Sequence, residues 1–534
     1  MATQSPPDER YREDEIAEST EETPFIPEAE APSRAQRHGR GRRARASSIA
    51  SLGSAAPKVR RHGGIVAILC AVLFVASSSG GFHNMSATRI FEDILCRRYY
   101  GRVRGDGQPI DEEMCKVDAI QSELAYLFAV QNSLNAAVSL VAALPWGIAA
   151  DKIGRRLVFA IGMTGMSLSA LSIIVVGWFD QVLSPRLMWL SPISLLLGGG
   201  NPILAATIMS IAVDVVPESE RSTSFMRLHG ASMVGNLISP ALAALLMASA
   251  GPWPSIFLGF LLLLLPAFAI FIVPETLKHD QRAEGDERDS STFKAHLVQS
   301  LRELRKSASA FGSRSMIIVL LITMLQLSLV ICTFQFLSQF ASKRYNIPLA
   351  DTGFIQSAYG VAFITVSFFI MPWIASEILK PGAPAFIRFD DNRQRDLFLA
   401  RGSYVASLIG TFILGLSGSL PGFVFGLAIL AFGVSGEGFL KSIATLHVTV
   451  EQRSRLFTIL GLSAIASDLW ISPALAALFS LGMRLGGIWI GLPYFGVSGL
   501  CVIMVCMAVF IRLPQAPPAD EEYHSDPERI PNSE

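Results

Sequence analysis

The sequence predicts an all-α membrane protein whose twelve transmembrane helices form two parallel six-helix repeats. Three observations predict this fold class: a low content of charge, a series of long apolar segments, and a sequence that recurs in the second half. Of the 534 residues, 51% are hydrophobic and 16% are charged, and the mean hydropathy is +0.43. Soluble domains carry about 25% charged residues, so the composition indicates that lipid surrounds most of the chain.

Apolar segments of about 18–27 residues recur from Gly63 onward, each long enough to cross roughly 30 Å of hydrocarbon as a helix. The twelve predicted helices begin near Gly63, Leu124, Leu157, Leu187, Ser222, Ser255, Ser315, Asp351, Ser403, Leu420, Leu456 and Gly487. The chain then divides into a disordered cytosolic tail at 1–62, a six-helix bundle at 63–274, a cytosolic linker at 275–314, a second six-helix bundle at 315–513 and a disordered cytosolic tail at 514–534. Both tails are too polar to bury an apolar core.

Basic residues in the short loops orient the predicted helices. Most of them lie on the side of the N-terminal tail, namely Lys152, Arg155, Arg156, Arg221, the segments 278–314 and 380–401, Arg453 and Arg455. The positive-inside rule therefore places both termini in the cytosol, with a long first outer loop at 83–123. Neither tail carries an address that separates the plasma membrane from the vacuolar membrane. Of the two we favour the plasma membrane, and we expect a monomer.

A sequence repeat relates the two halves. The eight residues Ile238–Leu245 recur without change at Ile471–Leu478, and Ser210–Ala212 recur at Ser442–Ala444. The fourth and fifth helices therefore correspond to the tenth and eleventh, which makes the halves parallel repeats. Parallel six-helix halves are the plan of a transporter fold that binds its solute between them, near the membrane midplane.

Composition and short motifs argue against several other classes of function. Lys and Arg number 44, as do Asp and Glu, so the net charge of 0 gives no sign of a nucleic-acid partner. The sequence has no Gly-Lys dipeptide and therefore no phosphate-binding loop of the pump type. Its histidines are scattered and no Cys-x-x-Cys occurs, which argues against a metal site and an intramembrane enzyme. We therefore expect no cofactor, no metal and no ATP.

A glycine-rich, charged motif lies between the second and third predicted helices. It reads Gly147-Ile148-Ala149-Ala150-Asp151-Lys152-Ile153-Gly154-Arg155-Arg156. Glycine allows a close helix approach or a tight turn, and the charged side chains can hold the ends of neighbouring helices together. The motif resembles the G-x-x-x-D-[RK]-x-G-R-[RK] signature that the major facilitator superfamily carries in this loop. The matching residues are Gly147, Asp151, Lys152, Gly154, Arg155 and Arg156.

This resemblance implies secondary active transport of a small organic solute by alternating access, with the motif as a cytosolic gate. It also implies that helices one, four, seven and ten line the cavity. Exporters of the family carry G-x-x-x-G-P-x-x-G-G on helix five, where this sequence keeps Gly235 and Pro240 but loses three glycines. Because Pro473 lies in an equivalent Ser-Pro-x-x-Ala-Ala segment, we interpret all three residues as helix-packing devices.

We expect proton-coupled export of a metabolite or xenobiotic. Proton-coupled uptake of a nutrient or vitamin-like solute is the alternative, and a transporter-derived sensor is a third. The pattern Arg89-x-x-Glu92-x-x-x-Cys96, followed by Tyr99-Tyr100 and Cys115-Lys116, resembles filamentous-fungal members of the family. A disulfide between Cys96 and Cys115 would pin the first outer loop on the oxidising side of the membrane, and two free thiols are the alternative.

Polar side chains within the apolar segments are candidates for function because an ionisable group in hydrocarbon is unfavourable. Glu437 and Lys441 are four residues apart and can pair on one helix face, whereas no partner for Asp468 is evident nearby. Glu437 and Asp468 are the candidates for proton coupling, and a purely structural pair is the alternative for Glu437. The candidate cavity or gate residues are Asn135, Asn201, Arg227, His229, Asn236, Gln326, Gln356 and Lys441. Hydrogen bonding between helices is the alternative role for the neutral ones.

Overall fold

The structure of the chain is a computed structural model that describes residues 62–101, 111–217, 220–275, 313–334, 336–378, 391–448 and 453–513. These residues all belong to one compact unit of the chain, Ala56–Glu534. Apart from His62, the two predicted tails lie outside the described residues, as does nearly all of the predicted linker. The placement of the bundle boundaries at 274 and 315 stays a prediction.

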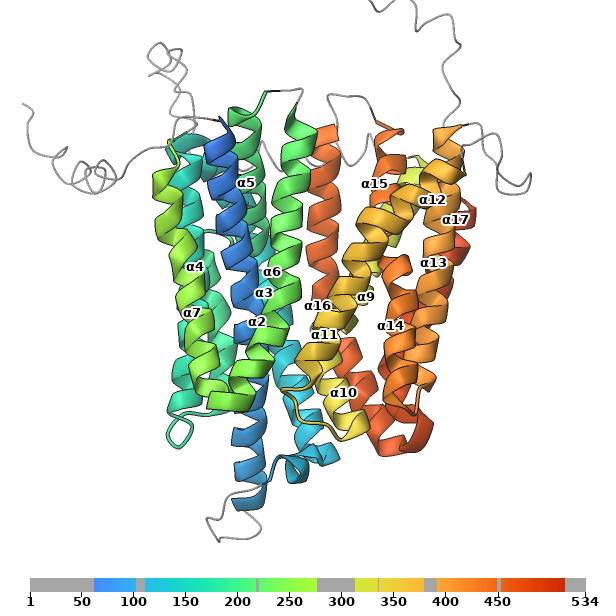
Figure 1. Ribbon diagram of the computed structural model, residues 1–534. Coiled ribbons are helices and arrows are strands. Elements are labelled where there is room, and N and C mark those ends of the chain that lie inside the picture. The colour runs from blue at the N-terminus through green and yellow to red at the C-terminus, as the bar shows by residue number, and fades with distance from the viewer. Residues whose placement is uncertain are drawn as a thin grey trace, which may run out of the picture. The chain divides into compact units, whose positions relative to one another are not determined.

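The first half contains six membrane-length helical segments (Figure 1). They are α2 (His62–Gly101), α3 (Asp118–Ile153), α4 (Arg155–Trp178), η2 (Pro185–Leu196) continued by α5 (Gly200–Val215), α6 (Arg221–Ala250), and α7 (Pro252–Ala269) continued by η4 (Ile270–Ile272). The short helix η1 (Glu112–Lys116) precedes α3.

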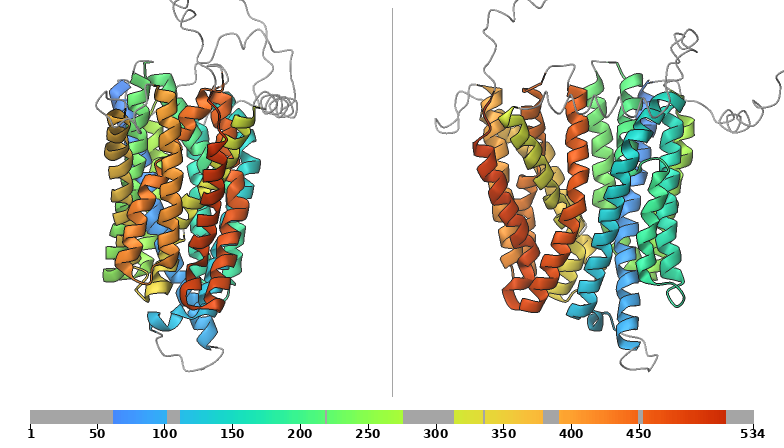
Figure 2. Two further views of the ribbon diagram at one scale, coloured as in Figure 1. Left: turned by 90° about the vertical axis from the view of Figure 1, so that its right-hand side faces the viewer. Right: turned by 180° about the vertical axis from the view of Figure 1, so that it is seen from behind.

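The second half contains six more (Figure 2). They are α9 (Arg314–Phe334), which is followed by the shorter α10 (Leu337–Tyr345); α11 (Thr352–Thr365), η6 (Val366–Ile370) and α12 (Met371–Glu377) in one span; α13 (Asn392–Leu416); α14 (Leu420–Val434) with α15 (Glu437–Thr445); α16 (Arg453–Leu485); and η8 (Gly487–Gly491) with α17 (Leu492–Val509). Twelve segments within the described ranges are thus long and apolar enough to cross a membrane, and no strand occurs there, which confirms the predicted fold class.

The predicted starts of the second and ninth helices are wrong by more than a few residues. The ninth helix, α13, begins at Asn392 because the side chain of Asp391 caps it by accepting a hydrogen bond from the Arg393 N–H at 2.9 Å. The predicted outer loop at 83–123 is largely helical, since α2 extends to Gly101 and α3 begins at Asp118. Hydropathy misses this extension because charged residues share the helix with buried Phe91 and Ile94.

Helices from the two halves pack closely against one another. The pairs α3 with α16 and α6 with α11 lie side by side (Figure 1). A Cβ on Gly353 of α11 would lie 2.4 Å from the carbonyl oxygen of Pro240 on α6, so the backbones meet without an intervening side chain. Within the first half, a Cβ on Gly235 would lie 2.6 Å from the Phe74 carbonyl oxygen of α2. Small residues therefore determine how near these helices approach.

Candidate functional site

The charged motif forms the turn from α3 to α4, which we call the motif end of the helices. Gly154 has a φ of 110°, a conformation that favours glycine. A Cβ at Gly154 would also lie 2.7 Å from Oε2 of Glu275, whose Oε1 accepts a hydrogen bond from the Arg155 N–H at 3.2 Å. Gly147 has no neighbouring atom within 4 Å of a Cβ, so a close helix approach at that glycine is not what the structure shows.

The two arginines of the motif fasten neighbouring helix ends. The Arg155 guanidinium pairs with the Asp214 carboxylate and donates to the Ser210 carbonyl oxygen of α5 at 2.9 Å. Arg156 donates to the Val273 carbonyl oxygen at 3.1 Å and lies 5.4 Å from the ring centroid of Phe271. Lys152 is exposed, and the side chain of Asp151 lies outside the described residues. Sequence reasoning did not assign Asp214 or Glu275 to this cluster, because both are remote in sequence.

The first half contains a cavity of about 580 Å³ whose wall is partly polar and partly apolar. Three of the predicted cavity residues line it together: Asn135 of α3, Asn201 of α5 and Asn236 of α6. The remaining wall combines amide, hydroxyl and imidazole groups with Phe and Met side chains. Among the described residues that line it, there is no Asp, Glu, Lys or Arg.

Several polar atoms of this cavity lack a hydrogen-bond partner in the described part of the chain. Gln131 is 3% exposed, and its Nε2 donates to Ser191 Oγ at 2.6 Å while its Oε1 has no partner. Asn135 Oδ1 and His83 Nδ1 are in the same situation. An unsatisfied buried polar group costs about 1–3 kcal/mol, so the cavity is suited to a hydrogen-bonding solute or to water. His83 was missed, although a histidine within an apolar segment is a usable signal.

A second, smaller cavity of about 120 Å³ lies between the two halves. It shares Asn84, Phe128 and Asn132 with the larger cavity, and Gln339 and Ser472 contribute from the second half. Neither cavity is lined by described residues of α14 or α15, which differs from the expectation that the tenth helix takes part. The eleventh helix, α16, instead lines the smaller cavity with Ser472, Leu475 and Ala476.

The expectation that Asp468 has no partner is wrong. Ser472, one helical turn further along α16, donates from Oγ to Asp468 Oδ1 at 2.6 Å. Because Ser472 also lines the smaller cavity, Asp468 is one hydrogen bond away from the cavity wall. This hydrogen bond could have been predicted from the sequence, since residues four apart share a helix face.

The other candidates lie elsewhere. Lys441 and Glu437 form an ion pair of 2.6 Å on α15, with side chains 44% and 43% exposed, and His229 of α6 is near enough to interact electrostatically with both. Arg227 is exposed on α6. Gln326 and Gln356 are buried in the second half away from both cavities, and within the described residues neither amide atom of Gln326 has a hydrogen-bond partner.

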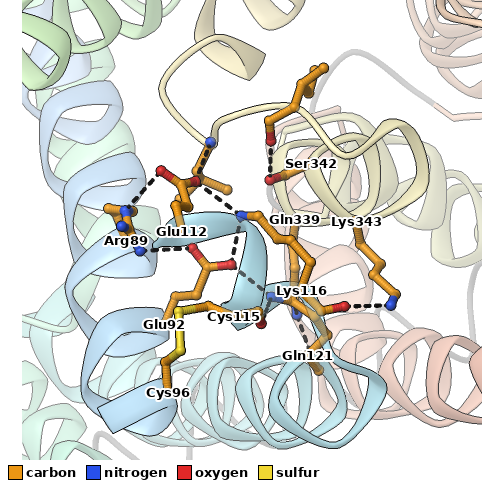
Figure 3. Close-up of polar contacts among 12 residues, drawn as sticks. Arg89, Glu92, Cys96, Glu112, Cys115, Lys116, Gln121, Gln339, Ser342 and Lys343 are labelled. Atoms are coloured by element: carbon orange, nitrogen blue, oxygen red, sulfur yellow. Dashed lines mark hydrogen bonds and ion pairs between the residues drawn. A yellow bond between two sulfur atoms is a disulfide. The ribbon is translucent and has the colours of Figure 1, made fainter. Parts of the chain in front are cut away.

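A disulfide joins Cys96 of α2 to Cys115 of η1, at the end of α3 opposite the motif, and we call this the disulfide end (Figure 3). Beside it, Glu92 is 1% exposed and accepts hydrogen bonds on Oε1 from Lys116 Nζ and Gln121 Nε2, both at 2.7 Å. Glu112 lies 3.0 Å from the same Lys116 Nζ. From the sequence, Glu92 and Lys116 served only as part of the resemblance to filamentous-fungal transporters. That they form a buried polar cluster was not predicted.

Comparison with known proteins agrees with the fold and the motif. The family model described as Major Facilitator Superfamily matches residues 119–470. The chain is 28% identical over 445 residues to "MFS efflux pump atnC" of Emericella nidulans, covering 80% of this chain and 83% of that protein. It is 28% identical over 450 residues to "Efflux pump ustT" of Aspergillus flavus, covering 80% and 85%.

Among solved structures, a D-xylose-proton symporter matches with a TM-score of 0.57 at 13% identity, covering 84% of this chain and 98% of the symporter. At that identity the likeness supports the fold alone. The family match spans most of the chain, and the motif lies in the turn between the second and third membrane segments. The chain therefore belongs to the Major Facilitator Superfamily and is a multi-pass membrane transporter of a small-molecule solute, resembling fungal efflux transporters, and not an enzyme.

Proposed function

We propose that the chain exports an uncharged, amphipathic metabolite or xenobiotic in exchange for protons. The observation that carries this proposal is the position of Ser472, which lines the cavity between the halves and donates a hydrogen bond to Asp468. A donor group of the solute and a protonated Asp468 carboxyl group would then compete for the one Ser472 hydroxyl oxygen.

The cavity wall supports an uncharged solute. A buried charge without a partner of opposite sign is strongly unfavourable, and the described lining residues of both cavities include no Asp, Glu, Lys or Arg. The apolar part of the wall, with Phe128, Phe159, Met163 and Met166, suits the apolar part of a solute. The unsatisfied oxygens of Gln131 and Asn135 suit its hydroxyl or amide donors. These features favour an uncharged solute over an organic anion.

Coupling follows from the two states of the Asp468 carboxyl group. The ionised carboxylate only accepts hydrogen bonds and therefore holds the Ser472 hydroxyl. A protonated carboxyl group can itself donate to the Ser472 oxygen, and it then occupies the acceptor site that a donor group of the solute would use. Glu437 is a weaker candidate because its pair with Lys441 is exposed and exposed pairs have little energetic effect.

The rest of the proposal follows the family plan. The two six-helix bundles rock about the solute, the motif end faces the cytosol, and the motif cluster latches that side. Both termini lie in the cytosol, and the protein acts as a monomer in the plasma membrane without ATP. The two relatives named as efflux pumps favour export over uptake.

The test uses purified protein in sealed vesicles that contain a pH-sensitive dye. Three fluorescent probes are compared: uncharged Nile red, cationic rhodamine 6G and anionic carboxyfluorescein. We expect Nile red to move in one direction while protons move in the other, and we expect the anion not to move. Movement of the probe and protons in the same direction would indicate uptake, and preference for the anion would overturn the assigned solute class.

A further inference from the structure

We propose that η1, fastened to α2 by the Cys96–Cys115 disulfide, is a gate arm that closes the solute path at the disulfide end by docking on the second half. Opening of this gate would require η1 and α10 to separate, and loss of the disulfide would favour the open state. The inference rests on transport by the family, and its test depends on neither the proposed solute nor the proton.

The gate arm is held rigidly on its own side. Lys116 is 6% exposed and contacts the buried Glu92 at 2.7 Å and Glu112 at 3.0 Å. Arg89 of α2 lies 3.2 Å from Glu92 and 3.3 Å from Glu112. Two cations thus bind two carboxylates across the α2–η1 contact, and the disulfide is the covalent tie at the same place (Figure 3).

The same segment reaches the second half through several polar contacts. Glu112 Oε1 accepts a hydrogen bond from the Leu349 N–H at 2.8 Å. Lys343 of α10 donates to the Lys116 carbonyl oxygen and lies 2.6 Å from the Asp118 carboxylate. Gln339 of α10 donates from Nε2 to the Gln121 carbonyl oxygen at 2.8 Å. Side chains and backbone of the segment from Glu112 to Gln121 therefore contact both halves at once.

This contact lies on the solute path. Gln339, which binds Gln121 across the two halves, also lines the smaller cavity. The cavity includes Thr88 and Ala125 of the first half, which belong to α2 and α3 near the gate arm. Separation of α10 from η1 and the start of α3 would therefore remove part of the cavity wall at the disulfide end.

Loss of the disulfide would have a different effect if its role were purely structural. If the disulfide only stabilised the first half, its loss would lower thermal stability without changing access to the cavity. If η1 is a gate arm, loss of the bond that positions it on α2 makes its docking on α10 less favourable. Access from the disulfide end then rises while the motif end is unaffected. Access to the cavity is therefore the discriminating measurement.

The experiment places a reporter cysteine at Thr88→Cys and measures its labelling by a membrane-impermeant maleimide, applied to each side of oriented vesicles. The reporter is compared in the disulfide-bonded protein and in the Cys96→Ser/Cys115→Ser variant, and proteins without the reporter correct for the remaining cysteines. We expect labelling from the disulfide end to be faster by roughly tenfold in the serine variant, because an arm that the disulfide no longer preorganises docks less tightly on the second half. Equal labelling rates in the two proteins would overturn the proposal.

A second variant keeps the disulfide and tests the docking contact itself. Lys343→Met removes the ion pair with Asp118 and should also speed labelling. Arg186→Met is the matched control, because its partner Glu123 lies in the same half at 3.7 Å, and it should leave the rate unchanged. If the serine variant does not fold, Lys343→Met still tests the proposal. An unchanged labelling rate in Lys343→Met would overturn the proposed gate. Failure of this test leaves the assigned solute and proton unaffected.

Discussion

The same eight residues, Ile-Ser-Pro-Ala-Leu-Ala-Ala-Leu, occur on α6 and on α16 and have different surroundings in the two places. On α6, Ile238, Leu242 and Leu245 are exposed, whereas on α16 Ile471 and Leu475 are 1% and 4% exposed. The first copy thus turns much of its apolar face outward, to where lipid would lie. The second copy turns the corresponding face into the core.

The serines of the two copies differ in the same way. Ser239 is 1% exposed, and its Oγ has no hydrogen-bond partner in the described residues and lies against Gly81. Ser472 donates to Asp468 and lines a cavity. Asp468 corresponds in the repeat to Gly235 or Asn236, neither of which is a carboxylate. One copy therefore packs helices, while the other combines packing with a titratable group, and the residue one turn earlier makes the difference.

The largest expected effect comes from Asp468→Asn, which makes the second copy chemically similar to the first. Proton movement coupled to solute should fall by roughly two orders of magnitude, because an amide does not bind and release a proton. The pH-dye vesicle assay measures it, with Glu437→Gln as the control that retains coupling. Adding Asn236→Asp to the first variant should not restore coupling, and restoration would mean that the two copies are interchangeable.

Gly235→Ala tests the packing role of the first copy. The new Cβ would lie 2.6 Å from the Phe74 carbonyl oxygen, so α2 and α6 must shift apart. We expect a loss of about 1–3 kcal/mol in the free energy of unfolding, as for other overpacked sites. Gly461→Ala on α16 has open space around its Cβ and should cost nothing measurable. Thermal unfolding in detergent compares them, and equal behaviour of the two variants would contradict a packing role.

The two serines provide a direct comparison. Ser472→Ala removes a hydrogen bond to a carboxylate and should slow coupled transport by roughly tenfold. Ser239→Ala removes a hydroxyl group that has no hydrogen-bond partner among the described residues, and should leave both transport and stability nearly unchanged. The vesicle assay and thermal unfolding are the readouts. A larger loss from Ser239→Ala would reverse the assignment of roles.

The smallest effect concerns pH at the gate arm. Burial raises the pKa of Glu112, but Lys116, the Leu349 amide and Arg89 lower it more, and the net pKa lies below its usual range. Its contacts are therefore fully present at neutral pH and are lost as the pH falls through this lowered pKa. Labelling of Thr88→Cys from the disulfide end should rise modestly in acid. Glu112→Gln should raise labelling at neutral pH and flatten the pH dependence, and an unaltered pH profile would exclude this carboxylate as the cause.

The predictable part of the fold depended on the length of apolar segments and on the repeat. Most of the twelve helices begin within a few residues of their predicted starts because a membrane-spanning helix needs a minimum apolar length. The errors at α2, α3 and α13 have one cause: charged residues were treated as loop. In the structure, Arg89, Glu92 and Asp396 are helical, and Glu92 and Asp396 are at most 9% exposed.

The sequence by itself determined the family, the parallel repeat, the turn at Gly154 and the short-range pair of Glu437 with Lys441. These features depend on local spacing or on a contiguous motif, which a linear sequence displays directly. Only the tertiary structure decided which polar residues meet: Asn135, Asn201 and Asn236 in one cavity, Glu112 with Leu349, and Ser472 as the link from Asp468 to the cavity wall. The physical reason is that helix periodicity tells which residues share a face, whereas the packing of helices distant in sequence decides what that face contacts.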